Sequence, residues 1–517
     1  MAHPVLDKLQ RPETFNFALD VVDKWAAQSP PVEAILWVSS DGETVRSLSY
    51  RHFAQQSHRI AILLQRLGAR PGETMLMVLP RVQEWWEIAT AGLRSGIVIA
   101  PATTLLTAAD IEYRVRKSKA AIFVGDETSI SKVLQIRARC PSLRTIFQVD
   151  GNRIAETGVT NLQEALQSVP LDAEYPTIRF PWNALAIVYF TSGTSGLPKM
   201  VRHNQVSYPL GWGKAAYPYF GAWNCGASLF IWDDRQTFNP LSLLNIIHRS
   251  PITTMCVTPL AWRQLVGAQC REYYAKHRPK ALRECTSAGE PLDPGVISQW
   301  QNITGLMIRE GYGQTEAILM CGIYGDFPIK PGSMGKPLPG VPLTGDLAIL
   351  LAADEGNNST FFGIFDGYVD DNGQVARRER VVNDSNGQTV QRWYMTDDVI
   401  NSSGYRIGPF EVESTLRKHP AVAECAVISS PDEARGEVVK AIIVIAQGYV
   451  TSPRDALMKE LQDFSKASSA PYKYPRKIAF VEAETLPRTT SGKIKRAELR
   501  RLEWKDAKAK ARRAHKL

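Results

Sequence analysis

The chain has 517 residues, more than one hydrophobic core usually holds, so we expect two or three domains. Apolar residues make up 44% of the sequence and charged residues 22%, a composition that fits an ordinary soluble protein. The formal charge is +9, and no apolar run is long enough to cross a bilayer, which excludes a membrane-spanning chain.

Targeting signals, where a sequence carries them, usually lie at its two ends. The stretch from Met1 to Pro12 has neither the apolar core of a signal peptide nor the Arg- and Ser-rich character of a transit peptide. The last three residues, His515-Lys516-Leu517, are close to the peroxisomal Ser-Lys-Leu type. We therefore expect a cytoplasmic or peroxisomal protein rather than a mitochondrial one.

Much of the positive charge lies in the tail. A solvated, frayed end is the simplest interpretation of this segment. Nucleic-acid binding is not expected, because Trp504 is the one aromatic residue beside these charges. The basic residues of the tail are Lys505, Lys508, Lys510, Arg512, Arg513 and Lys516.

Helices and strands alternate in the first 130 residues. Apolar spacing predicts helices around 53–67, 85–88 and 108–117. Short apolar runs predict strands at 75–79, 97–100 and 121–124. This alternation indicates a parallel sheet covered on both faces, with ligands expected at the carboxyl ends of its strands.

The elements become smaller from about Asp397. We predict a helix at 411–417, strands at 425–429 and 438–445, and a helix with Leu457, Leu461 and Phe464 on one face. These elements suffice for a compact domain of roughly 100–120 residues. The predicted fold class is therefore α/β, with a large N-terminal domain at 1–396 and a smaller α+β domain at 397–517.

The strongest local signal follows an apolar strand at 186–190. It reads Thr191, Ser192, Gly193, Thr194, Ser195, Gly196, Leu197, Pro198 and Lys199. Glycines let backbone N–H groups approach an anion, hydroxyls add donors, and the lysine adds positive charge. The composition indicates a phosphate-gripping loop, although a Ser/Gly-rich surface turn is the alternative for such a loop taken alone. It is not a Walker A loop, because no Gly-Lys-Ser/Thr ends it.

Together with three later segments, this loop resembles the motifs of the adenylate-forming superfamily, in the same order. That superfamily includes acyl-CoA synthetases, luciferases and the adenylation domains of peptide synthetases. Two segments match its adenine pocket, and the last matches the segment that bears its catalytic lysine. They are Ser287-Ala288-Gly289-Glu290-Pro291, Glu310-Gly311-Tyr312-Gly313-Gln314-Thr315-Glu316 and Pro487-Arg488-Thr489-Thr490-Ser491-Gly492-Lys493.

Further segments are most similar to medium-chain acyl-CoA synthetases, at 80–86, 404–411 and 470–477. The similarity runs from about Phe15 to Trp504. It implies that a medium-chain or aromatic carboxylic acid attacks MgATP to give acyl-AMP and pyrophosphate. The smaller, mobile domain then rotates, and the thiol of coenzyme A displaces AMP. The expected partners are therefore this acid, ATP, Mg²⁺ and coenzyme A, with the oligomeric state left open.

The resemblance also implies roles for individual residues. Lys493 would bridge the carboxylate and the α-phosphate, and Thr315 would touch the α-phosphate. Glu316 would bind Mg²⁺, Lys199 and its loop would hold the β- and γ-phosphates, and Tyr312 would lie against adenine. The other implied nucleotide-binding residues are Gly289, Glu290, Pro291, Glu310, Gly311, Gly313 and Gln314. Near coenzyme A it places Ser403, Gly404, Tyr405, Arg435 and Lys466, with Arg406 near nucleotide or substrate and Asp397 at the hinge.

Three internal segments of the family pattern are missing. The chain passes directly from Gly211 to Trp212, where the family has a strand-containing segment beside the substrate pocket. It omits one hairpin after Leu343 and another after Thr396. The last hairpin carries the family's ribose-binding Asp and a nearby Arg, and neither has a counterpart here. Leu105 is a smaller departure, at a position where relatives carry a polar residue near coenzyme A.

These departures leave several interpretations open. The chain is an AMP-forming acyl-CoA ligase, a catalytically impaired relative that binds nucleotide or coenzyme A, or an incomplete gene model of such a ligase. A ligase that makes an adenylate for another acceptor is a further alternative, and the medium-chain segments argue against it.

Overall fold

The computed structural model forms two compact units. Unit 1 comprises Met1–Thr191 and Met200–Trp393, and unit 2 comprises Ser192–Lys199 and Tyr394–Leu517. Residues 396 and 397, between which the sequence places the domain boundary, lie outside the described residues. The structure describes residues 12–191, 198–207, 217–289, 292–339, 341, 343–344, 348–352, 366–369, 374–376, 379–383, 389–394, 400–402, 405–407, 409–432, 436–468, 473–489, 492 and 494–514.

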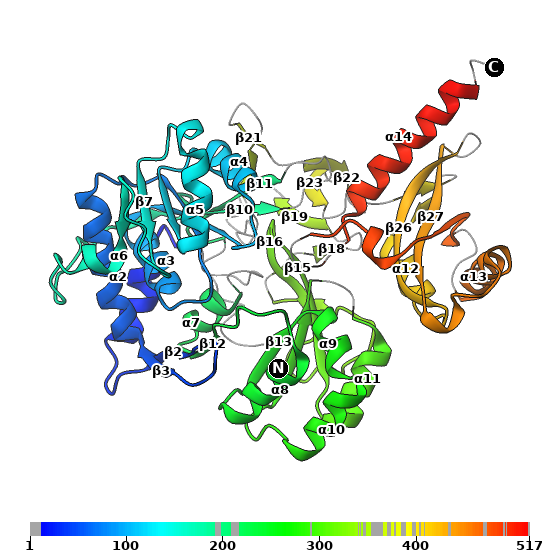
Figure 1. The fold of residues 1–517 in the computed structure, drawn as a ribbon, viewed down its shortest axis with the longest axis horizontal. Coiled ribbons are helices and arrows are strands. Elements are labelled where there is room, and N and C mark those ends of the chain that lie inside the picture. Colours follow the sequence, from blue (N-terminus) through cyan, green and yellow to red (C-terminus); the bar gives the residue numbers. More distant parts are fainter. Residues whose placement is uncertain are drawn as a thin grey trace. The chain divides into compact units, whose positions relative to one another are not determined.

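A nine-stranded sheet forms the first layer of unit 1 (Figure 1). The strands from β10 to β8 run parallel, whereas β20 runs antiparallel to β11. In spatial order the strands are β21 (Val375–Ala376), β20 (Gly367–Val369), β11 (Lys199–Asn204), β10 (Leu185–Thr191), β5 (Val98–Ala102), β4 (Thr74–Val78), β6 (Ile122–Gly125), β7 (Thr145–Gln148) and β8 (Val159–Asn161).

Helices cover both faces of this sheet, as the sequence predicts. Along β4, Met75 and Met77 pack in the cluster that holds the buried residues of α2 and α3. Leu76 and Val78 pack instead in the cluster that holds those of α4 and α5. Successive side chains of a strand point to opposite faces, so each cluster fills one face. The helices are α2 (Tyr50–Arg66), α3 (Glu84–Ser95), α4 (Ala108–Ser118) and α5 (Glu127–Ile136).

The end of α2 differs from the prediction by one residue. The helix begins after Ser49, whose side chain accepts a hydrogen bond from the backbone N–H of His52, and it ends at Arg66. Leu67, which the spacing placed on the apolar face, is 43% exposed. It lies beyond the last helical turn, so it no longer follows the helical period that buries Leu64.

Two further sheets of unit 1 share one hydrophobic core. Helices α8 (Pro240–Arg249), α9 (Pro259–Leu265), α10 (Ala268–Lys276) and α11 (Pro294–Thr304) pack around this core. The first sheet contains, in order, β12 (Leu229–Trp232), β2 (Glu33–Val38) and β3 (Val45–Ser49). The second contains β13 (Thr254–Val257), β14 (Glu284–Ala288), β15 (Ile308–Gln314), β16 (Ala317–Gly322) and β17 (Lys336–Pro337).

In the part of the chain that the structure describes, no strand pairing joins these two sheets. β12 is the edge of one sheet and β13 is the edge of the other. Phe230 and Trp232 of β12 nevertheless pack in the same core as Met255 and Val257 of β13. Among the described residues, no strand pairs with the outer side of either edge. Open edges of this kind are expected where a core strand is missing, as the sequence indicates after Gly211.

The remaining elements of unit 1 are short. A four-stranded sheet contains β18 (Leu343–Thr344), β19 (Ala348–Ala352), β23 (Thr389–Tyr394) and β22 (Glu379–Asn383). The others are β1 (Thr14–Phe15), β9 (Phe180–Pro181), η1 (Ala18–Asp23), η2 (Arg137–Arg139), η3 (Tyr217–Gly221), α1 (Lys24–Ala26), α6 (Leu162–Leu166) and α7 (Ala222–Asn224).

Unit 2 is a small α+β unit, which agrees with the predicted fold class (Figure 1). Its fully buried Glu413 accepts two hydrogen bonds from Arg496 and one from the backbone N–H of Val427, so it joins α12 to α14 and β26. The elements are β24 (Ile400–Ser402), β25 (Tyr405–Ile407), α12 (Pro409–Leu416), β26 (Val422–Asp432), β27 (Gly436–Ile445), η4 (Gln447–Tyr449), α13 (Arg454–Ser468), β28 (Lys477–Phe480), η6 (Ala483–Thr485) and α14 (Arg496–Ala514).

Candidate active site

The two predicted adenine segments lie on neighbouring parallel strands. β14 ends beside Gly311 on β15. Gly289 follows β14 with a φ of +98°, a backbone conformation that favours glycine. Glu290 and Pro291 lie outside the described residues. The carboxyl ends of these strands thus bring Gly289 beside the segment Glu310–Gln314, at the edge where α/β sheets usually bind ligands.

A tight turn carries Thr315 and Glu316. It joins β15 to β16, which run antiparallel. The register between the two strands shifts on both sides of Gly313, so the end of β15 is bulged. Tyr312, beside this bulge, is half-buried, and burial raises the pKa of its phenol to about 12. The phenol therefore stays neutral at physiological pH.

The carboxyl group of Glu310 is buried and binds the backbone of a neighbouring segment. Its side chain is only 6% exposed, and Oε1 accepts a hydrogen bond from the backbone N–H of Leu292 at 2.9 Å. Burial raises the pKa of Glu310 from 4.5 to about 7, because the charged form loses its water. The contact fixes the start of the segment after Pro291 onto β15.

The carboxylate of Glu316 is nearly buried and is held from the first sheet. Its exposed fraction is 8%, and its Oε1 accepts a hydrogen bond from the Tyr368 hydroxyl at 2.8 Å. Tyr368 belongs to β20, the strand paired with β11. A carboxylate has about four acceptor sites, and the Tyr368 hydroxyl occupies one of them.

The backbone of the same turn is held by His203 of β11. This ring is fully buried, and Nε2 lies 2.6 Å from the carbonyl oxygen of Thr315. Nδ1 lies 3.2 Å from the hydroxyl oxygen of Ser207. Burial lowers the pKa of His203 to about 3, so the ring is neutral. A carbonyl only accepts, so Nε2 donates to Thr315 and Nδ1 accepts from Ser207.

The predicted phosphate loop connects two strands of the nine-stranded sheet. β10 ends at Thr191, which is half-buried, and β11 begins at Lys199, also half-buried. Pro198 precedes β11 in the described part of the chain, whereas residues 192–197 lie outside it. The strand that leaves the loop is therefore the strand that carries His203.

Most predicted residues of unit 2 lie outside the described residues. Lys466 is an exception: it is exposed on α13, with Nζ 2.9 Å from Oδ1 of Asp463 and 4.6 Å from the ring centre of Tyr474. Tyr405 and Arg406 belong to β25, but their side chains are not described. The residues outside are Asp397, Ser403, Gly404, Arg435 and Lys493. Leu105, in unit 1, is 64% exposed.

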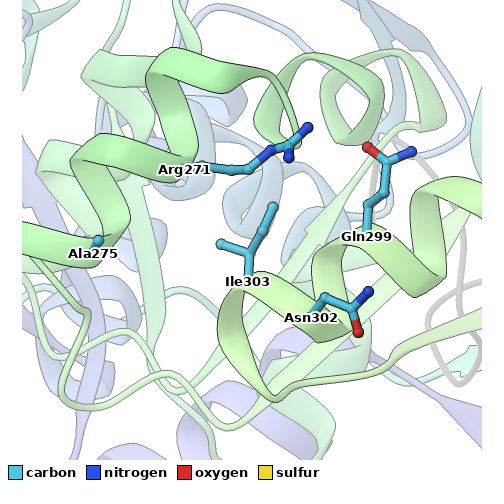
Figure 2. A pocket seen from close by; sticks show the side chains of 5 residues that line it. All are labelled: Arg271, Ala275, Gln299, Asn302 and Ile303. Atoms are coloured by element: carbon cyan, nitrogen blue, oxygen red, sulfur yellow. The ribbon is translucent and has the colours of Figure 1, made fainter.

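Two pockets lie away from the predicted residues. One, of about 370 Å³, lies between α10 and α11. Figure 2 shows the side chains that line it, which are Arg271, Ala275, Gln299, Asn302 and Ile303. A second, of about 350 Å³, is lined by residues of α14, β26 and β27. No predicted site residue lines either pocket, so neither supports the predicted chemistry.

Sequence reasoning missed His203 and Tyr368. Their strands lie next to each other only in the folded sheet, and Tyr368 follows a stretch where the family pattern is interrupted. A signal was available for His203, since a histidine in a buried strand just after the phosphate loop needs polar partners.

Two family models match the chain. The model described as AMP-binding enzyme matches residues 22–210 and 205–344. The model described as AMP-binding enzyme C-terminal domain matches residues 411–493. The first match breaks at 205–210 and ends at 344, next to two of the three positions where segments are missing.

Similar proteins are acyl-CoA synthetases. Human "Acyl-coenzyme A synthetase ACSM3, mitochondrial" is 38% identical and covers 96% of this chain and 91% of its own. Mouse "Acyl-coenzyme A synthetase ACSM5, mitochondrial" is 38% identical and covers 95% and 91%. The alignment with human ACSM3 spans 551 positions, more than the 517 residues of this chain. At least 34 positions of the alignment therefore have no residue here, which agrees with the missing segments.

Solved structures show the same fold. An acyl-CoA synthetase from Brucella canis is 27% identical, with a TM-score of 0.63 and coverage of 96% of both chains. The anthranilate-CoA ligase AuaEII, in complex with anthranoyl-AMP, has a TM-score of 0.73 and covers 96% of this chain and 98% of its own. At 24% identity it bears on the fold alone.

The predicted cytoplasmic or peroxisomal location is wrong. The similar synthetases from human, orangutan and mouse are named mitochondrial. The tripeptide His515-Lys516-Leu517 departs from Ser-Lys-Leu at its first position, and such an address is read by a receptor rather than fixed by the fold. Among the described residues, no helix combines the length and apolar character that a bilayer span requires.

Replacing Glu310 should change how stability depends on pH. The folded protein holds the Glu310 proton up to about pH 7, whereas the unfolded chain releases it near 4.5. Its effect on stability is therefore favourable below pH 4.5 and is lost as pH rises through 7. Glu310→Gln keeps an acceptor for Leu292 without this charge. We expect it to gain about 1–3 kcal/mol relative to wild type between pH 5 and 8, measured by denaturant unfolding.

The matched control is Glu284→Gln, an exposed carboxylate on the neighbouring strand β14. This substitution should alter the free energy of unfolding by no more than about 0.5 kcal/mol anywhere between pH 5 and 8. If the difference in free energy of unfolding between Glu310→Gln and wild type did not change with pH, the raised pKa of the buried Glu310 carboxyl would be contradicted.

Proposed function

This chain belongs to the family of AMP-binding enzymes and is an acid–thiol ligase that uses ATP and coenzyme A, and we propose that its substrates are medium-chain or aromatic carboxylic acids. The acid attacks the α-phosphate of ATP to give acyl-AMP and pyrophosphate, and the thiol of coenzyme A then displaces AMP. The observation that carries the proposal is the 38% identity to human ACSM3 over 96% of the chain. The segments at 80–86, 404–411 and 470–477 support the medium-chain class.

The first half-reaction brings two anions together, so it needs cations and donors aimed at the developing charge. We assign the β- and γ-phosphates to the loop from Thr191 to Lys199. Thr315 is assigned to the α-phosphate and Tyr312 to adenine. Lys493 would neutralise the carboxylate and the α-phosphate as they meet. The order of these segments in the sequence supports the assignment.

Glu316 fits a magnesium ligand. Mg²⁺ keeps several waters and usually binds one or two carboxylates together with substrate phosphates. Within the part of the chain that the structure describes, no group of three His, Cys, Asp or Glu residues could hold a metal by itself. A single carboxylate is enough for this mode of binding, and the Tyr368 hydroxyl orients the carboxylate of Glu316. Bound there, the ion would neutralise phosphate charge.

The second half-reaction would use unit 2. We propose that the domains divide at 396/397 and that Asp397 is the hinge between them. The separate matches of the two family models support this division. We assign the binding of coenzyme A to Ser403, Gly404, Tyr405, Arg435 and Lys466, and we place Arg406 near nucleotide or substrate.

The names of the similar synthetases support a mitochondrial location.

Impaired nucleotide binding is the second candidate, and the missing segment after Thr396 favours it. The family's ribose-binding Asp and its nearby Arg have no counterpart here. Hydrogen bonds to charged groups contribute about 1.5–3 kcal/mol each. The loss of two such contacts corresponds to roughly 10²- to 10⁴-fold weaker ATP binding.

Pyrophosphate release with octanoate tests the proposed reaction. With coenzyme A present, we expect pyrophosphate, AMP and octanoyl-CoA in equal amounts. Among butyrate, octanoate, palmitate and benzoate, octanoate or benzoate should give the highest kcat/KM. Pyrophosphate release without any acyl-CoA would show that another acceptor is used. A preference for palmitate would contradict the medium-chain class.

Lys493→Ala should separate the two half-reactions. The lysine is needed while two negative groups are in contact, and this repulsion is gone once acyl-AMP has formed. We expect acyl-AMP formation to fall by about 10²-fold or more, with thioester formation from supplied acyl-AMP largely intact. Lys495→Ala, an exposed lysine two residues away, is the control and should leave both rates near wild type. Equal losses in both steps would indicate a structural role for Lys493.

Restoring the hairpin after Thr396 tests the second candidate. An insertion with the family's Gly-Asp and Gly-Arg should lower the KM for ATP by at least about tenfold, because it returns two charged contacts. A matched insertion with the Asp and Arg replaced by Ala is the control. If the unmodified chain already activates octanoate at an ordinary rate of about 1–10³ s⁻¹, ribose must be held by other residues.

A further inference from the structure

One face of the β11–β20 pair carries three polar residues. Side chains alternate along a strand, so Lys199, Val201 and His203 of β11 share a face. Val201 lies directly opposite Tyr368 of β20, and directly opposed residues in an antiparallel pair also share a face. Lys199, His203 and Tyr368 are therefore on the same side of this pair.

Two of these residues contact the turn between β15 and β16, in the five-stranded sheet. His203 donates to the carbonyl oxygen of Thr315, and Tyr368 donates to the carboxylate of Glu316. The first bond fixes the backbone of the turn, and the second fixes the side chain that follows. The turn is thereby tied to the strand that begins with Lys199, where the predicted phosphate loop ends.

His203 is itself rigidly held. The Ser207 hydroxyl faces its other ring nitrogen, and Ser207 is fixed by its backbone N–H, which donates to Oδ1 of Asn204 at 2.8 Å. The side-chain amide of Asn204 donates a hydrogen bond, through Nδ2, to Oδ1 of Asp366, which lies just before β20. The ring also packs edge-on against Tyr189 of β10, with centroids 6.0 Å apart. A fully buried ring with both nitrogens engaged has one available orientation.

We propose that His203 is a positioning residue, assisted by Tyr368, that fixes Thr315 and Glu316 against strands β11 and β20 and so couples magnesium binding to ATP binding. The proposal rests on the proposed roles of Thr315 and Glu316 in binding ATP and magnesium. His203 acts through Thr315 and does not touch the reacting atoms. Burial lowers the pKa of His203, so its ring stays neutral at working pH and works as a hydrogen-bond donor rather than as an acid or base.

The test compares two substitutions of His203 in the full chain. His203→Gln places an amide N–H near the position of Nε2, whereas His203→Leu fills the space without a donor. The dissociation constant of ATP is measured by calorimetry with and without Mg²⁺. We expect Mg²⁺ to tighten ATP binding in wild type and His203→Gln. In His203→Leu this tightening should shrink by about 10- to 100-fold, the usual cost of losing a residue that orients a metal ligand.

His58→Leu is the matched control for lost stability. His58 also lies in unit 1, where its Nδ1 accepts a hydrogen bond from the backbone N–H of Tyr175. Its removal should lower the midpoint of unfolding and leave the effect of Mg²⁺ on ATP binding as in wild type. If His203→Leu does not fold, Tyr368→Phe takes its place, because it removes one hydroxyl from Glu316 and should also weaken the effect.

The outcomes separate the inference from the function on which it rests. If wild type binds ATP equally with and without Mg²⁺, the metal assignment fails. If wild type shows the effect and His203→Leu keeps it, the positioning role fails. It also fails if His203→Gln is as impaired as His203→Leu. As a second readout, acyl-AMP formation by His203→Gln should keep the wild-type pH profile over roughly pH 6–9, and a lost limb would instead assign proton transfer to the ring.

Discussion

The hydrogen bond between His203 and the Thr315 carbonyl joins the nine-stranded sheet of unit 1 to its five-stranded sheet, and the geometry of the candidate site depends on it. The nine-stranded sheet supplies the strands around the phosphate loop, and the five-stranded sheet supplies the turn with Glu316. Each sheet fixes its own strands by backbone pairing. Their relative placement at the site, however, is set by side chains, and a buried neutral donor to a backbone carbonyl does this without adding charge.

The layers of the fold could be predicted because their signals are local. Alternating faces of β4 and the apolar stripe of α2 follow from short-range periodicity. The exposed Leu67 shows the limit of this reasoning, because helix ends depend on capping and tertiary contacts more than on spacing. The open edges of β12 and β13 follow from the order of the strands in their sheets, which local patterns in the sequence do not determine.

The site could be predicted only as far as its motifs reach. The segments around Lys199, Gly289 and Glu316 could be recognised as short sequence motifs. In the structure, the last two segments follow adjacent strands, β14 and β15. The contacts of His203 and Tyr368 span 112 and 52 residues, so they depend on sheet register that no short pattern encodes. The location was mispredicted for a different reason, since a targeting tripeptide has no counterpart in packing or burial.

The open edges of β12 and β13 have a consequence for handling the protein. Unpaired N–H and C=O groups along a strand are a template for another chain, and natural proteins usually cover them. Here two such edges flank a single core in the described residues, and Cys256 of β13 is exposed beside one of them. Self-association through strand pairing, followed by thiol oxidation, would then limit the concentration at which this chain stays monomeric during purification.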